Sequence, residues 1–227
     1  MSIFSGPKII KDSSLILNLD AGNRKSYSGS GTSWNDLSSI KNVATLNGSP
    51  SFSSSYGGYI TFNGTTNQYA QVVNANPYNF TTGLFTLECW AAVISNNGAG
   101  YGRFFEHVYT NGYAFMIDGG NGQIAFEING NGTRTVYNKG STFVDNIWRQ
   151  YLVVRTGSTT ASIYINGRNV ANGNVVGGAM TSTSPLQISS SSYPLGFNVA
   201  IARVYNRALT ANEVYNNYIA DRGRFGI

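Results

Sequence analysis

Residues 201–214 read IARVYNRALTANEV, and this stretch joins a strand to the helix that the sequence predicts. Its first five residues close a strand-like run that starts at Phe197. The segment Thr210-Ala211-Asn212-Glu213 is a capping box, in which the threonine hydroxyl and the glutamate carboxylate bind backbone N–H groups of the first turn. Leu209 and Val214 have the spacing of a hydrophobic staple. The stretch therefore predicts a last strand followed directly by one short helix.

Strand-like runs bounded by Gly, Asn or Ser fill most of the sequence before this stretch. The longest run, residues 85–94, is apolar on both faces except at Glu88, which predicts a strand in the middle of a sheet. Asn166-Gly167 lies between two alternating runs, and both residues accept the positive φ of a type I′ hairpin turn. The runs are residues 15–20, 59–62, 69–73, 85–94, 104–108, 113–117, 123–128, 148–155, 161–165, 168–171, 186–189 and 197–205.

The composition excludes several classes of protein. Only 11% of the residues are charged and 13% are aromatic. Disordered chains carry many charges and few aromatic rings, and coiled coils need Ala, Glu, Lys and Leu in bulk, so both classes are excluded. The 27 glycines, with abundant Asn, Ser and Thr, are typical of short strands joined by tight turns. Because all-β sandwiches commonly use about this length for one unit, the 227 residues predict a single domain.

The charges and the apolar runs of the chain limit the partners that it can have. The net charge of +5 comes from basic residues scattered along the sequence, whereas nucleic-acid binding needs them clustered, so we predict no nucleic-acid partner. No apolar run approaches the ~20 residues of a membrane span, which predicts no membrane partner. The N-terminus lacks the apolar core of a signal peptide, so we expect synthesis as a cytosolic product. The single cysteine, Cys89, excludes a disulfide framework.

Four phrases point to a fold family: FTLECW at residues 85–90, WRQYLVV at 148–154, YING at 164–167 and the stretch at 201–214. Together they resemble the laminin-G-like, concanavalin A-like jelly roll, over roughly residues 14–220. The resemblance implies an all-β, antiparallel β-sandwich jelly roll with one short C-terminal helix. We expect an N-terminal arm over residues 1–13, the sandwich over 14–220 and a C-terminal tail over 221–227.

A narrower resemblance rests on GPKII at residues 6–10, LNLDAGN at 17–23, SYSGSGTSWNDL at 26–37 and RGRFG at 222–226. These phrases look like those of standalone domains of this type in tailed bacteriophages, which are commonly virion proteins. The resemblance implies a non-catalytic surface protein of the virion, as a capsid decoration or a tail or fibre component. Its partners would be other virion proteins, and it would be a homo-oligomer or a multicopy assembly. The residues of the terminal arms expected to dock are Phe4, Ile9, Ile10, Arg222, Arg224 and Phe225.

The main alternative is a carbohydrate-binding adhesin that recognises host or environmental glycans. Sugar binding uses aromatic faces together with amides, and the sequence places several aromatic residues in or beside predicted loops. Trp90 and Trp148 are expected in the core instead. The residues predicted to bind a glycan are Trp34, Tyr101, Tyr109, Tyr113 and Tyr193.

A glycoside hydrolase is the third hypothesis, because glucanases share this jelly roll. Their catalytic strand carries Glu-x-Asp followed closely by Glu, which places two carboxyl groups on one face within the reach that hydrolysis needs. Here no two acidic residues are closer than eight positions, so the motif is absent. A pair assembled across strands, such as Glu88 with Glu106 or Glu127, is the remaining route. We therefore predict that the chain is not an enzyme.

Calcium is the one cofactor that the resemblance suggests, since laminin-G-like domains often hold a Ca²⁺ at the sandwich rim with Asp, Asn and backbone oxygens. The pairs that could contribute are Asp20 with Asn18 and Asp118 with Asn121. No Asp-x-Asp-x-Asp loop is present, and Asp and Asn also serve as turn residues. We therefore favour a structural role for these residues and predict no cofactor, with a structural Ca²⁺ as the alternative.

Overall fold

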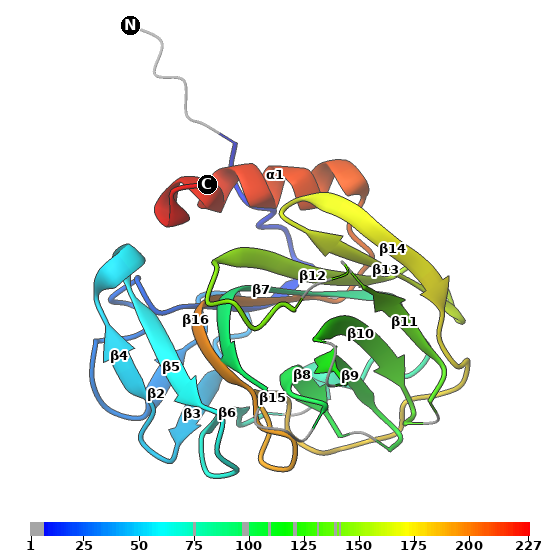
Figure 1. Cartoon of the computed structure of the whole chain (residues 1–227), viewed down its shortest axis with the longest axis horizontal. Coiled ribbons are helices and arrows are strands. Elements are labelled where there is room, and N and C mark those ends of the chain that lie inside the picture. The colour runs from blue at the N-terminus through cyan, green and yellow to red at the C-terminus, as the bar shows by residue number, and fades with distance from the viewer. Residues whose placement is uncertain are drawn as a thin grey trace, which may run out of the picture.

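Two antiparallel β-sheets pack face to face in the computed structural model (Figure 1). The structure describes residues 7–74, 76–96, 100–108, 110–119, 122–130, 132–138, 140 and 142–227. Within these residues each sheet has eight strands, and neighbouring strands run antiparallel. The predicted antiparallel sandwich with a short C-terminal helix is therefore confirmed.

Sheet A contains the longest strand in its interior. From edge to edge its order is β14 (Arg168–Asn174), β13 (Thr160–Ile165), β12 (Arg149–Arg155), β7 (Phe85–Ser95), β16 (Gly196–Tyr205), β5 (Tyr59–Asn63) and β4 (Ser51–Ser53), with β1 (Leu15–Asp20) also paired to β16. The position of β7 between β12 and β16 confirms the prediction for residues 85–94. Asn166 and Gly167 join β13 to β14 with φ of 51° and 74°, the positive values that a type I′ turn requires.

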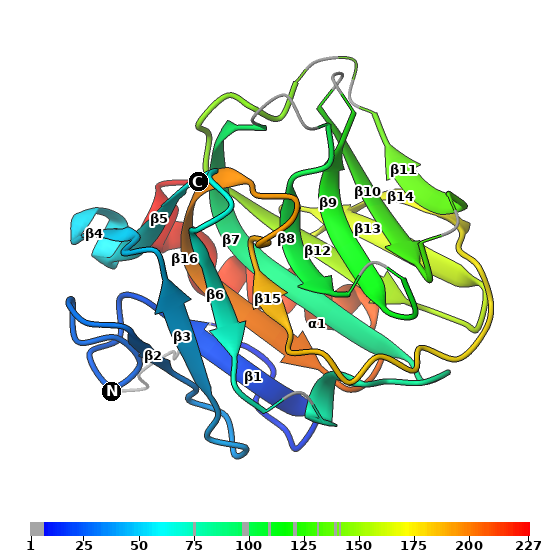
Figure 2. The same cartoon turned by 90° about the horizontal axis from the view of Figure 1, so that it is seen from below.

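Sheet B is built from shorter strands, including several that the sequence pattern misses. Its order is β11 (Arg134–Tyr137), β10 (Gln123–Ile128), β9 (Tyr113–Asp118), β8 (Arg103–His107), β15 (Gln187–Ile188), β6 (Tyr69–Val72), β3 (Val43–Asn47) and β2 (Ser33–Asn35) (Figure 2). The strands that were not predicted are β2, β3, β4 and β11. Three of them are edge strands, where few side chains are buried and the apolar alternation is weak.

The main core lies between the sheets and is filled by alternate residues of each strand. Leu87 and Cys89 of β7 point into it from sheet A, and Phe115 and Ile117 of β9 point into it from sheet B. The intervening residues of β7 therefore face away from the core, onto the outer face of sheet A. Among them Trp90 is fully buried, because other segments cover that face.

Helix α1 (Ala211–Asp221) covers part of the outer face of sheet A (Figure 1). The predicted capping box is present: Glu213 N donates to Thr210 Oγ1 at 3.3 Å, and Thr210 N donates to Glu213 Oε2 at 2.8 Å. Val214 packs with Leu152 and Leu209 in a small apolar cluster on this face. Short 3₁₀ helices occupy Ser55–Gly57 (η1), Asn76–Tyr78 (η2) and Arg222–Phe225 (η3). None of the helices in the described residues has the length and apolar character needed to cross a membrane.

The C-terminal residues fold back on the domain and bury Phe225, which contradicts its predicted docking to other proteins, whereas docking by Arg224 stays a prediction. The Phe225 ring stacks on Trp90 at a centroid distance of 4.4 Å and lies 4.8 Å from Trp148. Arg224 Nη1 donates to Asp20 Oδ1 at 2.7 Å. A large apolar ring next to an uncovered apolar sheet face gains most by burial there, and the chain is long enough to reach it.

The N-terminal arm follows the same pattern at Ile10. Its backbone N–H donates to Asn217 Oδ1 at 2.9 Å, and its carbonyl accepts from the Tyr205 hydroxyl at 3.3 Å. The side chain is half-buried and packs on the same outer-face cluster as Val214, and docking by Ile10 to another protein stays a prediction. Ile9 is half-buried and Arg222 is exposed, and for these two residues docking stays a prediction. Phe4 lies outside the described residues.

Candidate functional site

The outer face of sheet B carries a continuous row of mostly polar residues. Cross-strand partners in an antiparallel sheet share one face, so a chain of partners traces a line across it. Because neighbouring strands lie about 4.8 Å apart, this line crosses roughly 34 Å of sheet. We call it the polar row. Its members, each paired with the next, are Arg134, Glu127, Ala114, Glu106, Gln187, Gln71, Thr45 and Ser33.

Two carboxylates of the polar row face each other across Ala114. Glu106 and Glu127 are both cross-strand partners of this small residue, so no side chain of any size separates them. Each carboxylate also lies next to a guanidinium: Arg103 Nε is 4.0 Å from Glu106 Oε1, and Arg134 Nε is 3.7 Å from Glu127 Oε2. The arginines compensate the charge of two carboxylates that are almost fully buried.

Tyr101 and Tyr193 lie together next to Arg103 and Arg134. Their rings meet edge to face with centroids 6.4 Å apart, and Tyr101 is 40% exposed. Arg103 lies over the Tyr193 ring at 4.8 Å and Arg134 over the Tyr101 ring at 5.7 Å. The arginines that pair with the row carboxylates therefore also fix the two rings, so two of the predicted glycan-binding residues lie next to the polar row.

A groove of about 340 Å³, which we call the sheet B groove, opens beside this pair. Glu106 and Gln187 of the polar row line it, together with Tyr193, Ser191 and Thr110. Gln187 Oε1 accepts from Ser191 N at 3.0 Å, which holds the amide in place. Within the described residues the Gln187 Nε2 group has no partner, so it is available as a donor. The groove combines a ring edge, a carboxylate, an amide and hydroxyls, the set of groups that binds a polyol.

The family model described as the concanavalin A-like lectin/glucanases superfamily matches residues 46–215. The chain belongs to this superfamily. Both lectins and glucanases share the fold, so membership establishes the sandwich and leaves the activity to the site. A search among curated proteins finds no match to the sequence.

Solved structures with a similar fold include binding domains of bacterial toxins. The binding domain of Paraclostridial Mosquitocidal Protein 1 has a TM-score of 0.66 and 15% identity, over 90% of this chain and 52% of that one. The receptor binding domain of botulinum neurotoxin C/D mosaic serotype has a TM-score of 0.69 and 14% identity, over 90% of this chain and 51% of that one. The binding domain of botulinum neurotoxin DC, solved in complex with SialylT, has a TM-score of 0.68 and 14% identity, over 92% of this chain and 51% of that one. This concanavalin A-like chain thus spans about half of each structure, and at these identities the likeness shows the fold alone.

Burial corrects two of the predicted glycan-binding residues of this concanavalin A-like domain. Trp34 and Tyr113 are fully buried in the main core, so neither ring can stack on a ligand. Trp34 is the central residue of β2 and is flanked by exposed residues, which shows that its strand turns this side chain inward. Tyr113 packs on Phe85 at 4.8 Å and donates its hydroxyl to the Tyr78 carbonyl at 3.2 Å. Tyr109 lies outside the described residues.

Glu88 is separated from the polar row by the whole sandwich. It projects from the outer face of sheet A, opposite to Leu87 and Cys89, and is fully buried there. Burial raises the pKa of this carboxyl, although Arg203 Nη1 lies 3.3 Å away. Asn217 Nδ2 of α1 also donates to it at 2.8 Å. A catalytic pair of Glu88 with Glu106 or Glu127 is therefore excluded, because these carboxylates lie on opposite outer faces.

The oxygen atoms suggested for calcium are already used in ion pairs. Asp20 Oδ1 accepts from Arg224 at 2.7 Å, and Asp118 Oδ1 lies 2.7 Å from Arg134 Nη1. A guanidinium at this distance opposes a divalent cation at the same oxygen, so the two carboxylates do not fit a calcium site. Their proposed partners were Asn18, which accepts from Arg203 at 3.3 Å, and Asn121, which lies outside the described residues. Across the described residues, His, Cys, Asp and Glu side chains form no cluster of three or more suited to a metal.

The sequence interpretation missed most of the polar row. Gln71 and Gln187 lie between apolar residues that point into the core, and this alternation is the signal that places their side chains on the outer face. This alternation shows which side chains of a strand share one face, but it does not show which strands are neighbours in the sheet. The row could therefore be recognised only once the strand order was known.

Proposed function

We propose that this chain is a non-catalytic saccharide-binding module and that its binding site is the outer face of sheet B. The observation that carries the proposal is the Tyr101–Tyr193 pair beside the polar row. A sugar presents apolar C–H faces that pack on aromatic rings, and hydroxyls that exchange hydrogen bonds with amides and carboxylates. The sheet B groove offers both kinds of group, and its volume of about 340 Å³ suits a small ligand.

The carboxylates of the row support binding rather than hydrolysis. A glycoside hydrolase needs one carboxylic acid that holds a proton for the leaving group, and such acids lie in apolar surroundings. Glu106 and Glu127 each have a guanidinium within 4.0 Å, so neither lies in apolar surroundings. Of the two, Glu106 lines the sheet B groove, where its oxygens can accept hydrogen bonds from sugar hydroxyls.

The comparisons support a binding role without assigning one to this chain. The toxin structures of similar fold are described as binding domains, and one of them is a complex with SialylT. The superfamily includes lectins. Because the chain matches only about half of each toxin structure, the ligands of those proteins are not transferred to it.

The setting that we propose is the surface of a tailed-phage virion, where many copies act together on host or environmental glycans. The support is the resemblance of residues 6–10, 17–23, 26–37 and 222–226 to phage domains. Many copies raise the strength of weak single-site binding, because each further contact forms at a high effective concentration. Mass spectrometry of purified particles tests the setting: the chain should be present in multiple copies, and its absence would remove the virion from the proposal.

A glycan array probed with an oligomerised form of the chain tests the binding function. Neutral saccharides that bind should lose about tenfold in affinity with Tyr193→Ala, a loss of about 1.4 kcal/mol, because the variant removes the aromatic contact of the groove. Tyr56→Ala is the matched control, because this ring is half-exposed on η1 and lines neither of the grooves described for this chain. Silence across the array, or equal losses in the two variants, would contradict the proposal. Release of reducing ends from a bound polysaccharide, lost in Glu106→Gln, would show an enzyme instead.

A further inference from the structure

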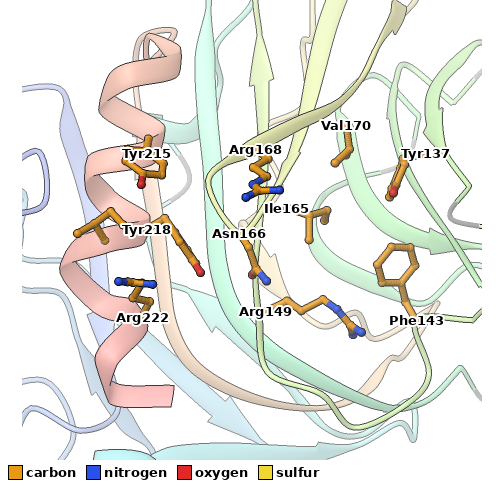
Figure 3. Close-up of a pocket in the computed structure, with 11 residues that line it drawn as sticks. Tyr137, Phe143, Arg149, Ile165, Asn166, Arg168, Val170, Tyr215, Tyr218 and Arg222 are labelled. Atoms are coloured by element: carbon orange, nitrogen blue, oxygen red, sulfur yellow. The ribbon is translucent and has the colours of Figure 1, made fainter. Parts of the chain in front are cut away.

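A second groove, of about 420 Å³, lies between α1, the β13–β14 turn and the end of β11 (Figure 3). We call it the α1 groove, because Tyr215 and Tyr218 of α1 form one wall. Tyr137 and Phe143 lie across from them, and Asn166 lies between the two walls (Figure 3). The β13–β14 turn and the helix are therefore both needed to form this groove, and it shares no residue with the sheet B groove.

The charge of the α1 groove is entirely positive among its described lining residues. Arg149, Arg168 and Arg222 line it, and no carboxylate does. Asp145 neutralises Arg149 through two hydrogen bonds of 2.7 Å. Arg168 and Arg222 are exposed, and within the part of the chain that the structure describes neither pairs with an acidic residue. Two uncompensated guanidinium groups thus face one hollow, and each can bind a carboxylate or sulfate through paired N–H donors.

The walls supply aromatic faces and neutral donors. Tyr215 is 50% exposed, and its ring lies 6.3 Å from that of Tyr218. In the described residues the hydroxyls of Tyr137, Tyr215 and Tyr218 have no hydrogen-bond partner. Asn166 uses its Oδ1 to accept from Gln150 N at 2.9 Å, which leaves its Nδ2 group as a donor for a ligand. The groove therefore has rings for an apolar face, donors for hydroxyls and cations for an acidic group.

We propose that the α1 groove binds an acidic saccharide, a sugar unit that carries a carboxylate or a sulfate. Charge complementarity selects an anion, and a free inorganic anion would use the two arginines and leave the tyrosine walls without a contact. A groove of about 420 Å³ takes a ligand of small-molecule size, which suits one or two sugar units. Tyrosine rings and hydroxyls side by side suit a ring-shaped polyol better than the extended backbone of an acidic peptide.

This inference is independent of the function proposed for sheet B. The sheet B groove is lined by Glu106, whose charge Arg103 compensates, whereas the α1 groove is lined by Arg168 and Arg222, which pair with no acidic residue in the described part of the chain. The two grooves therefore differ in the charge of the sugar that they accept. One chain could hold a neutral unit in one groove and an acidic unit in the other.

Titration calorimetry with matched pairs of ligands tests the proposal. The acidic probes are 3′-sialyllactose, tetragalacturonate and a heparin tetrasaccharide. The neutral counterparts are lactose, the methyl ester of tetragalacturonate and the desulfated, carboxyl-reduced tetrasaccharide. We expect at least one acidic probe to bind at least tenfold more tightly than its neutral counterpart. The affinity for this probe should fall as the salt concentration rises. The carboxylate and sulfate probes also show which acidic group the arginines prefer.

Variants then assign the binding to the groove. Arg168→Met and Arg222→Met remove exposed charges, so both variants should fold. Each should lower the affinity for the acidic probe about five- to tenfold. Tyr215→Ala should weaken it by a similar factor. Lys25→Met removes an exposed charge outside the groove and is the matched control. Tyr193→Ala in the sheet B groove should have no effect, so failure of either proposal can be told from failure of the other.

Several results would overturn the proposal. Equal affinity for the acidic and neutral members of every pair would show that the arginines do not select the ligand. A loss with Lys25→Met as large as with the arginine variants would show unspecific attraction to a basic surface. Competition by tetraglutamate at the same concentration as the acidic sugar would assign the groove to an acidic peptide. No binding of any acidic probe would leave the groove without the function that we propose.

Discussion

Replacing Phe225 by alanine tests whether the C-terminal segment is part of the folded domain. The ring is 5% exposed and stacks on Trp90 at 4.4 Å, with Trp148 at 4.8 Å. Phe→Ala at a buried position costs about 3–5 kcal/mol, and a segment at the chain end can relax, so we expect a loss of about 3 kcal/mol in the free energy of unfolding. For a domain of this size the melting temperature should fall by about 6–12 °C.

Equilibrium unfolding in urea measures this loss, and tryptophan fluorescence is a suitable signal because two indoles contact the ring. Phe225→Leu separates the contribution of apolar contact from that of ring stacking, because leucine keeps the first and loses the second. We expect this variant to lose about 1 kcal/mol in the free energy of unfolding. Ile227→Ala is the matched control: this residue is 39% exposed and two positions further along. It should change the free energy by less than about 0.5 kcal/mol.

A result for Phe225→Ala that equals the Ile227→Ala control would refute this reasoning. It would mean that residues 222–227 do not cover the outer face of sheet A in solution. The segment would then be free to dock on another protein, as the sequence analysis expected. The slope of the unfolding free energy against urea should stay constant, because the variant leaves the rest of the fold intact.

Three further substitutions have expected outcomes. Arg203→Met leaves the carboxylate of Glu88 buried without the cation 3.3 Å away, and should lower the free energy of unfolding at pH 7 by about 3–5 kcal/mol in urea titrations. Burial lowers the pKa of His107 from 6.5 to about 4, so its neutral form contributes stability above pH 6.5 that is lost as pH falls through 4. The melting temperature of His107→Phe should therefore fall less than that of the parent chain over this range. Gly167→Ala, at φ of 74°, places a Cβ 3.0 Å from Tyr218 Cβ and should cost about 1–3 kcal/mol, measured by thermal unfolding.

Local patterns predicted the parts of the fold that local physics determines. The capping box at Thr210 and Glu213 and the turn at Asn166-Gly167 depend on residues that are neighbours in the chain, and both are present as expected. The long apolar run at residues 85–94 is central because a strand buried on both faces must be covered on both. These features need no knowledge of which strands pair.

The candidate site depends on pairings between distant strands, and the sequence does not show them. The polar row joins Ser33 to Arg134 through strands that are not consecutive in the chain. The same limit explains the incorrect assignment of Trp34 and Tyr113, since aromatic residues near predicted loops can face either side of a strand. Phe225 was assigned to a tail because its partners, Trp90 and Trp148, are more than seventy positions away in the chain.

The buried ion pair of sheet A connects the stability of the fold to the shape of the α1 groove. Glu88 is costly to bury, and Gln150 Nε2 donates to it at 2.7 Å. The same Gln150 side chain accepts from Gly167 N at 2.9 Å through its Oε1 atom. Asn217 of α1 donates to the same carboxylate, so Glu88 is linked both to the helix and to the turn that enclose the groove. A charge in a central strand therefore holds α1 in one position against the sheet, and the spacing of the groove walls follows from that position.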